Sequence, residues 1–288
     1  MKPNQTGALL MMGSMAAFTF NDTLVKSVGA DLPLSQILVV RGGVASLLIF
    51  LLARYLGSLR MNLPRGDWML VLGRCLSEAG ATYLFLSALM LMPLANVTAV
   101  LQMLPLTVTL GAALFFGESI GWRRMAAILA GFCGMLLIVQ PGPEGFDGAS
   151  LYALGAVGCV TARDLFTRRM SAAVPSMTVT LMASLTVLSF GLIYSTQQDW
   201  RPMQGWHLGL LMGAACFIFA GYLFSVMTMR VGDVAVVSPF RYSGLLWALF
   251  LGWAVFGDWP GVLTLTGAAV VVAAGLFTFY RERQQTGR

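Results

Sequence analysis

Ala81-Thr-Tyr-Leu-Phe85 recurs in the second half of the chain as Ala220-Gly-Tyr-Leu-Phe224. At a nearly unchanged distance before each copy, Pro64-Arg-Gly-Asp-Trp68 is echoed by Pro202-Met-Gln-Gly-Trp206. Two more echoes keep the same order along the chain, which indicates that the protein is an internal duplication. They match Phe116-Gly-Glu118 with Phe256-Gly-Asp258, and Asp22 and Lys26 with Asp164 and Arg168.

Long apolar runs surround these echoes and fill the chain. Hydrophobic residues make up 58% of the 288 residues and charged residues only 10%, which excludes a soluble globular domain. A bilayer core about 30 Å thick needs roughly 20 apolar residues per helix, so each run is predicted to be a transmembrane helix. The ten runs cover 6–28, 34–54, 68–91, 93–117, 122–140, 149–170, 175–195, 206–229, 234–257 and 261–280.

The predicted fold class is an all-α integral membrane protein with ten transmembrane helices in two halves. The duplication assigns residues 1–141 to a first five-helix repeat, 148–281 to a second and 282–288 to a tail. Because each half holds an odd number of helices, the second half enters the membrane from the opposite side. Such inverted-topology repeats are typical of alternating-access carriers, which bind their solute near the bilayer midplane between the halves.

The basic residues of the loops predict that both termini are cytoplasmic. With this orientation the outer loops hold only Arg201, as the positive-inside rule requires. The inner segments then hold Lys2, Arg54, Arg60, Arg65, Arg123, Arg124, Arg168, Arg169, Arg230, Arg281, Arg283 and Arg288.

Several classes of function are disfavoured by what the chain lacks. Its basic residues are scattered over short loops rather than gathered in a patch, so no nucleic-acid partner is expected. The four cysteines lie inside apolar runs without metal-ligand spacing, and the only histidine, His207, stands alone. A P-loop and a nucleotide fingerprint are also missing, so we expect no cofactor, no metal and no catalysis.

Three short segments give the chain a family resemblance. They are Pro93-Leu-Ala-Asn-Val97, the stretch from Phe116-Gly-Glu118 to Gly121 with Gly131 after it, and Gly257-Asp258 to Gly261. On these segments the whole chain resembles a ten-helix member of the drug/metabolite transporter superfamily with two EamA-type domains. Within that superfamily it is similar to the bacterial aromatic amino-acid exporters. The resemblance implies a bacterial inner-membrane exporter of small metabolites.

Glu78 is the central acid among the charged residues of the predicted spans. Counting about 1.5 Å per residue from the start of its helix places it near the midplane, with Arg74 one turn away on the same face. One interpretation is a carboxylate that binds a proton or the amine of a solute. The alternative is a buried Glu78/Arg74 pair that only satisfies itself.

Other arginines lie at comparable depths. Arg163 and Arg241 fall in the cytoplasmic third of their helices, and Arg41 has the matching depth on the outer side. Together with Arg74, the residues Arg163 and Arg241 predict a basic inner vestibule that attracts a carboxylate. Arg241, which follows Pro239, is the first candidate to bind it. The alternative is that Arg163 pairs with Asp164 or snorkels, and that Arg241 binds neighbouring carbonyls.

The repeated pairs Asp22/Lys26 and Asp164/Arg168 each lie on one helix face, at opposite ends of the membrane. One hypothesis makes them the outer and inner gates of a rocking carrier, with the two aspartates as the deeper members. The alternative is that the basic members simply anchor helix ends in the headgroups.

Uncharged side chains complete the predicted substrate site. Gln102 lies near the midplane, three residues before Pro105, whose missing amide favours a kink that exposes backbone polar groups. Tyr83 and Tyr222 occupy equivalent places in the two halves and are candidates to stack on an aromatic solute, with Trp247 as apolar wall. For each of these, helix packing is the alternative.

The predicted function is a carrier that exports small organic solutes, such as aromatic amino acids, by alternating access. Its expected partners are the solute, the lipid bilayer and, as a coupling ion, the proton. A passive channel is one alternative, although it would not need two matched halves. A membrane-embedded enzyme or lipid scramblase is another, although it should show a convergent set of His, Asp or Ser residues near one interface.

Overall fold

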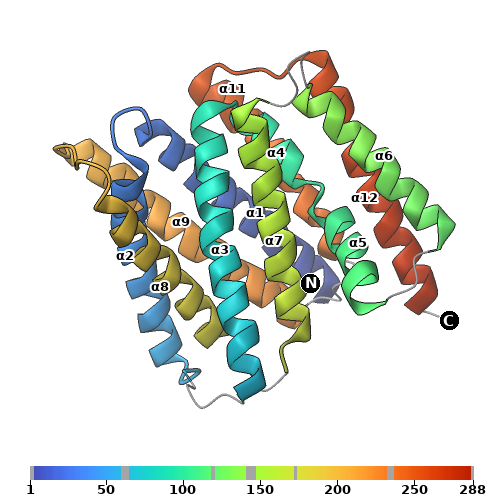
Figure 1. Cartoon of the computed structure of the whole chain (residues 1–288), viewed down its shortest axis with the longest axis horizontal. Helices are drawn as coiled ribbons and strands as arrows, with labels where there is room; N and C mark the ends of the chain where they lie inside the picture. The colour runs from blue at the N-terminus through green and yellow to red at the C-terminus, as the bar shows by residue number, and fades with distance from the viewer. Residues whose placement is uncertain are drawn as a thin grey trace.

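The computed structural model describes residues 3–59, 65–117, 121–140, 147–171, 174–231 and 237–286. Within these ranges the fold is all helical (Figure 1). Lys2, Arg60, Arg288, Pro64, Glu118 and the beginning of the predicted run 234–257 lie outside the described residues.

The first repeat contains six helices, of which two share one predicted span. Prolines Pro33 and Pro93 directly precede helices here, where the missing amide and fixed φ of proline suit a helix start. The helices are α1 (Pro3–Val28), α2 (Leu34–Tyr55), α3 (Arg65–Leu91), α4 (Leu94–Leu101), α5 (Leu104–Phe116) and α6 (Trp122–Val139).

Within the described residues the second repeat has the same order of elements, and the 3-10 helix η1 directly precedes α11 in its fourth span. Its elements are α7 (Gly148–Arg169), α8 (Ser176–Ser195), α9 (Gly205–Val231), η1 (Ser238–Tyr242), α11 (Ser243–Phe256) and α12 (Val262–Thr286). By length and composition, the described residues contain eight helices able to cross a membrane, with α4 and α5 taken together as one. The other two segments are the charged helix α7 and the pair η1–α11, which completes the ten predicted segments.

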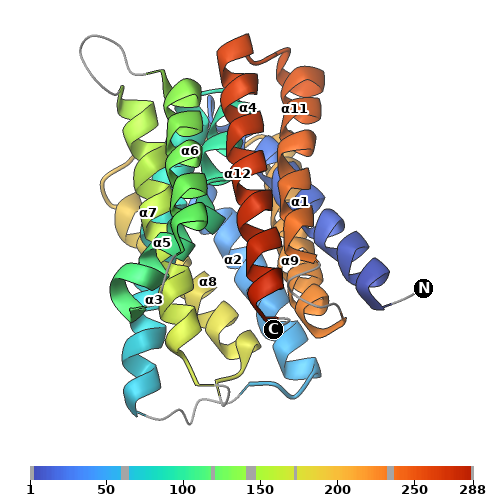
Figure 2. The same cartoon turned by 90° about the vertical axis from the view of Figure 1, so that its right-hand side faces the viewer.

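The two repeats pack as a pseudo-twofold pair. The first helix of each repeat lies along the third helix of the other: α1 along α9 and α7 along α3. Two further helices of the first repeat pack on their repeat mates, α2 on α8 and α6 on α12, and the second of these pairs faces the viewer in Figure 2. In the fourth spans, α4 packs on α11 and α5 packs on α7. Such reciprocal contacts are what inverted-topology repeats produce around an axis in the membrane plane.

Both repeats interrupt their fourth span at the same place. The run predicted over 93–117 is not one helix, because α4 ends at Leu101 and α5 begins at Leu104. After the interruption each repeat runs in α-helix to a left-handed glycine, Gly117 at φ 69° and Gly257 at φ 72°. Counting back equally from these glycines, the break at Gln102 corresponds to Tyr242, where η1 passes into α11.

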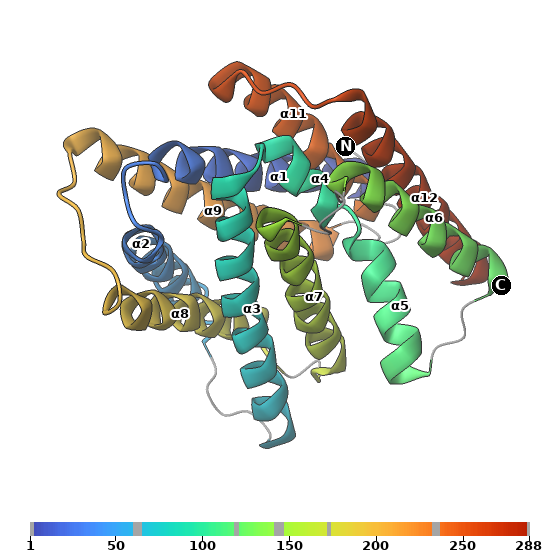
Figure 3. The same cartoon turned by 45° about the horizontal axis from the view of Figure 1, so that its top comes forward.

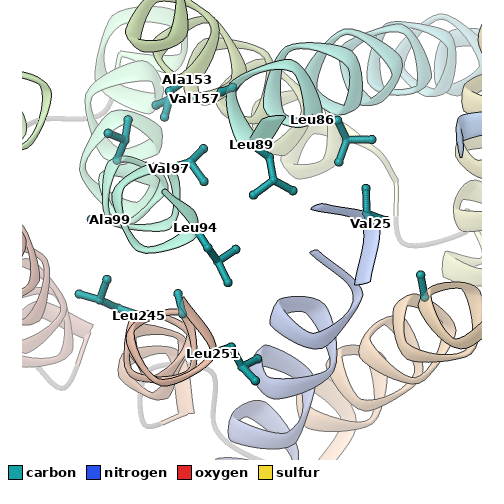
Figure 4. Close-up of a cluster of buried hydrophobic side chains, with 14 of the residues drawn as sticks. Val25, Leu86, Leu89, Leu94, Val97, Ala99, Ala153, Val157, Leu245 and Leu251 are labelled. Carbon is teal, nitrogen blue, oxygen red and sulfur yellow. The ribbon is translucent and has the colours of Figure 1, made fainter. Parts of the chain in front are cut away.

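The largest apolar cluster closes one end of the space between the repeats. It lies where α3 passes into α4, and we call this the Leu91 end. There α4 packs among α3, α7 and α11 (Figure 3). Buried side chains from α1, α3, α4, α7 and α11 converge in this cluster (Figure 4), including Val25, Leu86, Leu89, Leu94, Val97, Val157, Leu245 and Leu251.

Candidate functional site

A cavity of about 270 Å³ lies between the two repeats, next to the apolar cluster of the Leu91 end. Residues from α1, α2, α3, α4, α5, α7, α9, η1 and α11 line it, so both repeats build its wall. Its volume is near the lower end of the roughly 300–1,000 Å³ typical of small-molecule sites. The predicted site residues that line it are Asp22, Arg41, Glu78, Gln102, Arg163, Tyr222 and Arg241.

Much of the cavity wall is apolar and aromatic. Phe18 and Phe85 line it, and the Phe18 ring meets the Tyr222 ring edge to face, with centroids 5.4 Å apart. Leu86, Leu101 and other aliphatic side chains fill the rest, with threonine hydroxyls between them. An apolar wall with a few polar groups is the usual composition of a site for a small organic ligand.

Glu78 holds the centre of a charged network. Its Oε2 lies 3.4 Å from Nη1 of Arg163 and 3.7 Å from Nη2 of Arg74, and Tyr222 donates its hydroxyl to Oε1 at 3.4 Å. Arg163 is in turn held by Asp164, whose Oδ1 lies 2.8 Å from Nη2. The predicted pair of Glu78 with Arg74 is therefore present, but it belongs to a larger network, which keeps the carboxylate of Glu78 engaged on both oxygens.

A second polar group lies on α1 and α2. Arg41 is 5% exposed and donates from Nη1 to Oδ1 of Asn21 at 3.1 Å. Asn21, which is 2% exposed, donates from Nδ2 to Oδ1 of Asp22 at 2.9 Å. The amide thus bridges a cation and a carboxylate that make no direct ion pair. Asn21 was not among the predicted site residues, although a polar residue beside Asp22 inside an apolar run was a signal for it.

Arg241 projects from η1 into the cavity wall. Pro239 lies at the start of this 3-10 helix, where its missing amide interrupts regular α-helix. Among the described residues, none forms a hydrogen bond or ion pair with the Arg241 side chain. An arginine fork without an anion in a small cavity is a candidate carboxylate site.

The predicted kink at Gln102 is present as the break between α4 and α5. Pro105 has no amide hydrogen to donate to the carbonyl of Leu101. Leu101, Gln102 and Pro105 all line the cavity. Near Gln102, α11 comes close, because a Cβ added at Gly244 would lie 3.8 Å from Nε2 of Gln102. Backbone and amide polar groups are thus gathered where the two interrupted spans meet.

Four predicted site residues lie outside the cavity lining. Tyr83 packs instead in an aromatic cluster, with its ring centroid 5.6 Å from that of Tyr194 and 5.7 Å from that of Phe190. Trp247 packs against Phe20 at 6.1 Å. The remaining two, Arg74 and Asp164, reach the cavity only through Glu78 and Arg163.

At the Leu91 end, Lys26 of α1 contacts both α3 and α11. Its Nζ donates to the carbonyl of Leu89 at 2.6 Å and to that of Met92 at 2.8 Å, which are free at the C-terminus of α3. The same ammonium lies 5.6 Å from the centre of the Phe256 ring on α11. Cationic capping of a helix C-terminus is favourable, so Lys26 stabilises the closed arrangement of this end.

The charges on the lining are unequal. Arg41, Arg163 and Arg241 face the cavity, against the carboxylates of Asp22 and Glu78. Adding the partners outside the lining, Arg74 and Asp164, leaves the same excess of one cation. The site is therefore suited to a solute that brings a negative group.

Comparison with known proteins places this architecture in a family. The profile of the EamA-like transporter family matches the chain twice, over residues 5–140 and 148–280. A solved crystal structure covers 96% of the chain, and the chain covers 97% of it, with a TM-score of 0.67 at 18% sequence identity. At this identity the likeness concerns the fold alone.

Curated relatives extend over nearly the whole chain. A riboflavin transporter of Vibrio cholerae is 28% identical over 98% of this chain and 95% of its own length. A pseudopaline exporter of Pseudomonas aeruginosa is 29% identical over 94% of each chain. An S-adenosylmethionine uptake transporter of Rickettsia felis is 24% identical over 100% of this chain and 97% of its own. With two matches of its profile along one multi-pass membrane protein, the chain belongs to the EamA-like transporter family.

Proposed function

We propose that this small-solute transporter exports organic solutes that carry a carboxylate, aromatic amino acids among them, from the bacterial cytoplasm by alternating access. One observation carries the proposal: Arg241 faces the cavity without an anionic partner among the described residues. Among the other cations of the lining, Arg163 pairs with Glu78 and Asp164, while Arg41 makes no ion pair with a described residue and donates to the buried amide of Asn21. The carboxylate of a solute would lose water on entering this cavity, and Arg241 offers it a charge-assisted hydrogen bond.

The relatives support a carrier of small metabolites and differ in the solute and direction that their names give. They include an exporter and an uptake transporter. The solute class is therefore argued from the cavity. Its aromatic wall, Phe18 and Phe85, suits a planar apolar group, while Arg241 suits a carboxylate.

The direction of transport follows from the proposed orientation in the inner membrane. If both termini are cytoplasmic, as the loop arginines favour, the Leu91 end faces the periplasm. The apolar cluster and Lys26 close that end, so a solute reaches the cavity from the cytoplasm. Such a conformation is the one that loads an exporter.

Transport into liposomes that contain the purified protein tests the proposal. A panel of labelled phenylalanine, tryptophan, riboflavin and S-adenosylmethionine is added outside, with and without unlabelled solute inside. We expect saturable uptake of carboxylate solutes that is accelerated by internal solute, because a carrier exchanges and a channel does not. An imposed pH gradient then reports whether protons are coupled to transport.

The substitution Arg241→Lys sharpens this test. It keeps the positive charge but loses the planar fork that binds a carboxylate in two places. We expect about tenfold weaker transport of phenylalanine, the scale of one charge-assisted hydrogen bond, and little change for its methyl ester. An equal loss for acid and ester, or no loss for either, would show that the carboxylate is bound elsewhere.

A further inference from the structure

We infer that Asp22 is the ammonium-binding carboxylate of the cavity, so that the solutes are zwitterions held between Asp22 of one repeat and Arg241 of the other. The inference rests on the proposed function and deepens it, because it adds a second charged group to the solute. It also differs from the interpretation of the sequence, in which Glu78 binds the amine of the solute and Asp22 is a gate residue.

Asp22 is the carboxylate of the lining with the fewest partners. It lies in the last third of α1, and its one hydrogen bond with a described residue comes from Asn21 at 2.9 Å. Within the described ranges it makes no ion pair at 4.0 Å or less. A carboxylate inside a membrane protein is costly unless a cation or a proton accompanies it. Asp22 can therefore accept a hydrogen bond from a positively charged group of a ligand.

Glu78 lacks this capacity. Its Oε2 contacts Arg163 and Arg74, and its Oε1 accepts the hydroxyl of Tyr222. A solute ammonium would have to displace these donors and leave two buried guanidinium groups with less compensation. Asp22 can accept an ammonium without breaking any protein ion pair.

The bridge through Asn21 explains why Asp22 remains available despite a nearby arginine. Arg41 binds the carbonyl of the Asn21 amide, and the amide nitrogen binds Asp22. Arg41 and Asn21 are both buried, so packing fixes the orientation of the bridge. The positive charge of Arg41 thus lowers the free-energy cost of ionising Asp22, while the Asp22 oxygens stay open to a ligand. Asn21 acts as a positioning residue.

The remaining charges around Asp22 leave one complementary partner. The groups that face the cavity from the helices around α1 are Arg41 on α2, Glu78 on α3, Arg163 on α7, Tyr222 on α9 and Arg241 on η1. All but Arg241 contact another polar side chain of the described residues. One carboxylate without an ion pair and one guanidinium without a side-chain partner among the described residues therefore line the same cavity, from opposite repeats. A zwitterion brings one oppositely charged group for each of them.

Binding of three matched probes tests this inference: phenylalanine, 3-phenylpropionate, which lacks the amine, and 2-phenylethylamine, which lacks the carboxylate. We expect the wild type to bind phenylalanine at least about tenfold more tightly than 3-phenylpropionate, the scale of one charge-assisted hydrogen bond. Asp22→Asn keeps an oxygen for the Asn21 bond, so we expect it to bind phenylalanine as weakly as 3-phenylpropionate. Asp199→Asn, in the exposed loop between α8 and α9, is the matched control and should keep the preference.

Each outcome separates this inference from the proposed function. If the wild type binds phenylalanine and 3-phenylpropionate equally, the carboxylate site stands and the ammonium site is wrong. If it binds none of the probes while remaining folded, the proposed function itself is wrong. If Asp22→Asn weakens all probes equally, Asp22 is a structural residue. If it removes only the pH dependence of transport, Asp22 takes a proton and no ammonium, which also overturns the inference.

Discussion

Helices α1 and α7 carry the same pair of charges one turn apart, yet the structure places the two aspartates in different surroundings. Asp22 on α1 lines the cavity and makes no ion pair with any described residue, whereas Asp164 on α7 binds Arg163 at 2.8 Å and lies outside the lining. Lys26, one turn beyond Asp22, caps α3 at the Leu91 end. Equivalent residues of an inverted repeat thus serve different contacts in one conformation.

The difference is what the proposed alternating access would produce. A carrier of this architecture changes sides when its repeats exchange conformations, so a single state must be asymmetric. In the state described here, the contacts of Lys26 belong to the closed end. We expect α7 to take over corresponding contacts when the carrier faces the other way.

The largest expected effect concerns which end is outside. Cysteine labelling in intact cells, on a variant without the four native cysteines, compares positions 123 and 147, both exposed on the protein surface. Because loop arginines are enriched on the cytoplasmic side, we expect position 147 to face the periplasm and position 123 to face the cytoplasm. An impermeant maleimide should therefore label Asp147→Cys in intact cells and label Arg123→Cys only after the cells are opened. The reverse pattern would place the closed end in the cytoplasm and remove the support for export.

A stability measurement tests the network on α7. Arg163→Met leaves Glu78 and Asp164 without their shared cation, and removing one partner of a buried pair costs about 3–5 kcal/mol. We expect a large fall in the melting temperature of the detergent-solubilised protein. Adding Asp164→Asn to this variant should recover part of the loss, because Asp164 has no other ion-pair partner among the described residues, whereas Glu78 keeps Arg74. A melting temperature equal to that of the wild type would contradict the network.

The contacts of Lys26 predict a shift between conformations. Lys26→Met removes two charge-assisted hydrogen bonds to α3, each worth about 1.5–3 kcal/mol, and so weakens the closed Leu91 end. We expect labelling of a cysteine introduced at Leu94, which is fully buried here, to be faster by at least roughly a hundredfold, the scale of about 3 kcal/mol. The control is Arg168→Met, the repeat mate, which should not accelerate this labelling. Equal labelling rates in the wild type and Lys26→Met would show that Lys26 does not help to close this end.

The two matched tyrosines give the smallest expected effect. Tyr222→Phe loses a 3.4 Å hydrogen bond to Glu78 at the cavity wall, which is worth about 0.5–1.5 kcal/mol at most. We expect a few-fold change in the apparent affinity for solute in the liposome assay. Tyr83→Phe should leave affinity unchanged, because Tyr83 lies outside the lining. A larger effect at Tyr83 would mean that solute contacts the aromatic cluster.

Hydropathy and repeated motifs were enough to predict the ten apolar segments, the duplication and the family. Hydropathy and proline positions are local properties, because each span must bury its own backbone polar groups in a helix. The repeated motifs then paired the spans without reference to three-dimensional contacts. Depth along a helix follows from the rise per residue, which is why Glu78 could be placed near the midplane beside Arg74.

Only the tertiary structure decided which partner each charge takes. Tyr83 and Tyr222 are equivalent in sequence, but one packs among aromatic rings and the other reaches Glu78. The role of Asn21 as a bridge also depends on how α2 packs beside α1. Such contacts depend on helix rotation and on which conformation the repeats adopt, and the chain's residue spacing is the same in every conformation of the carrier.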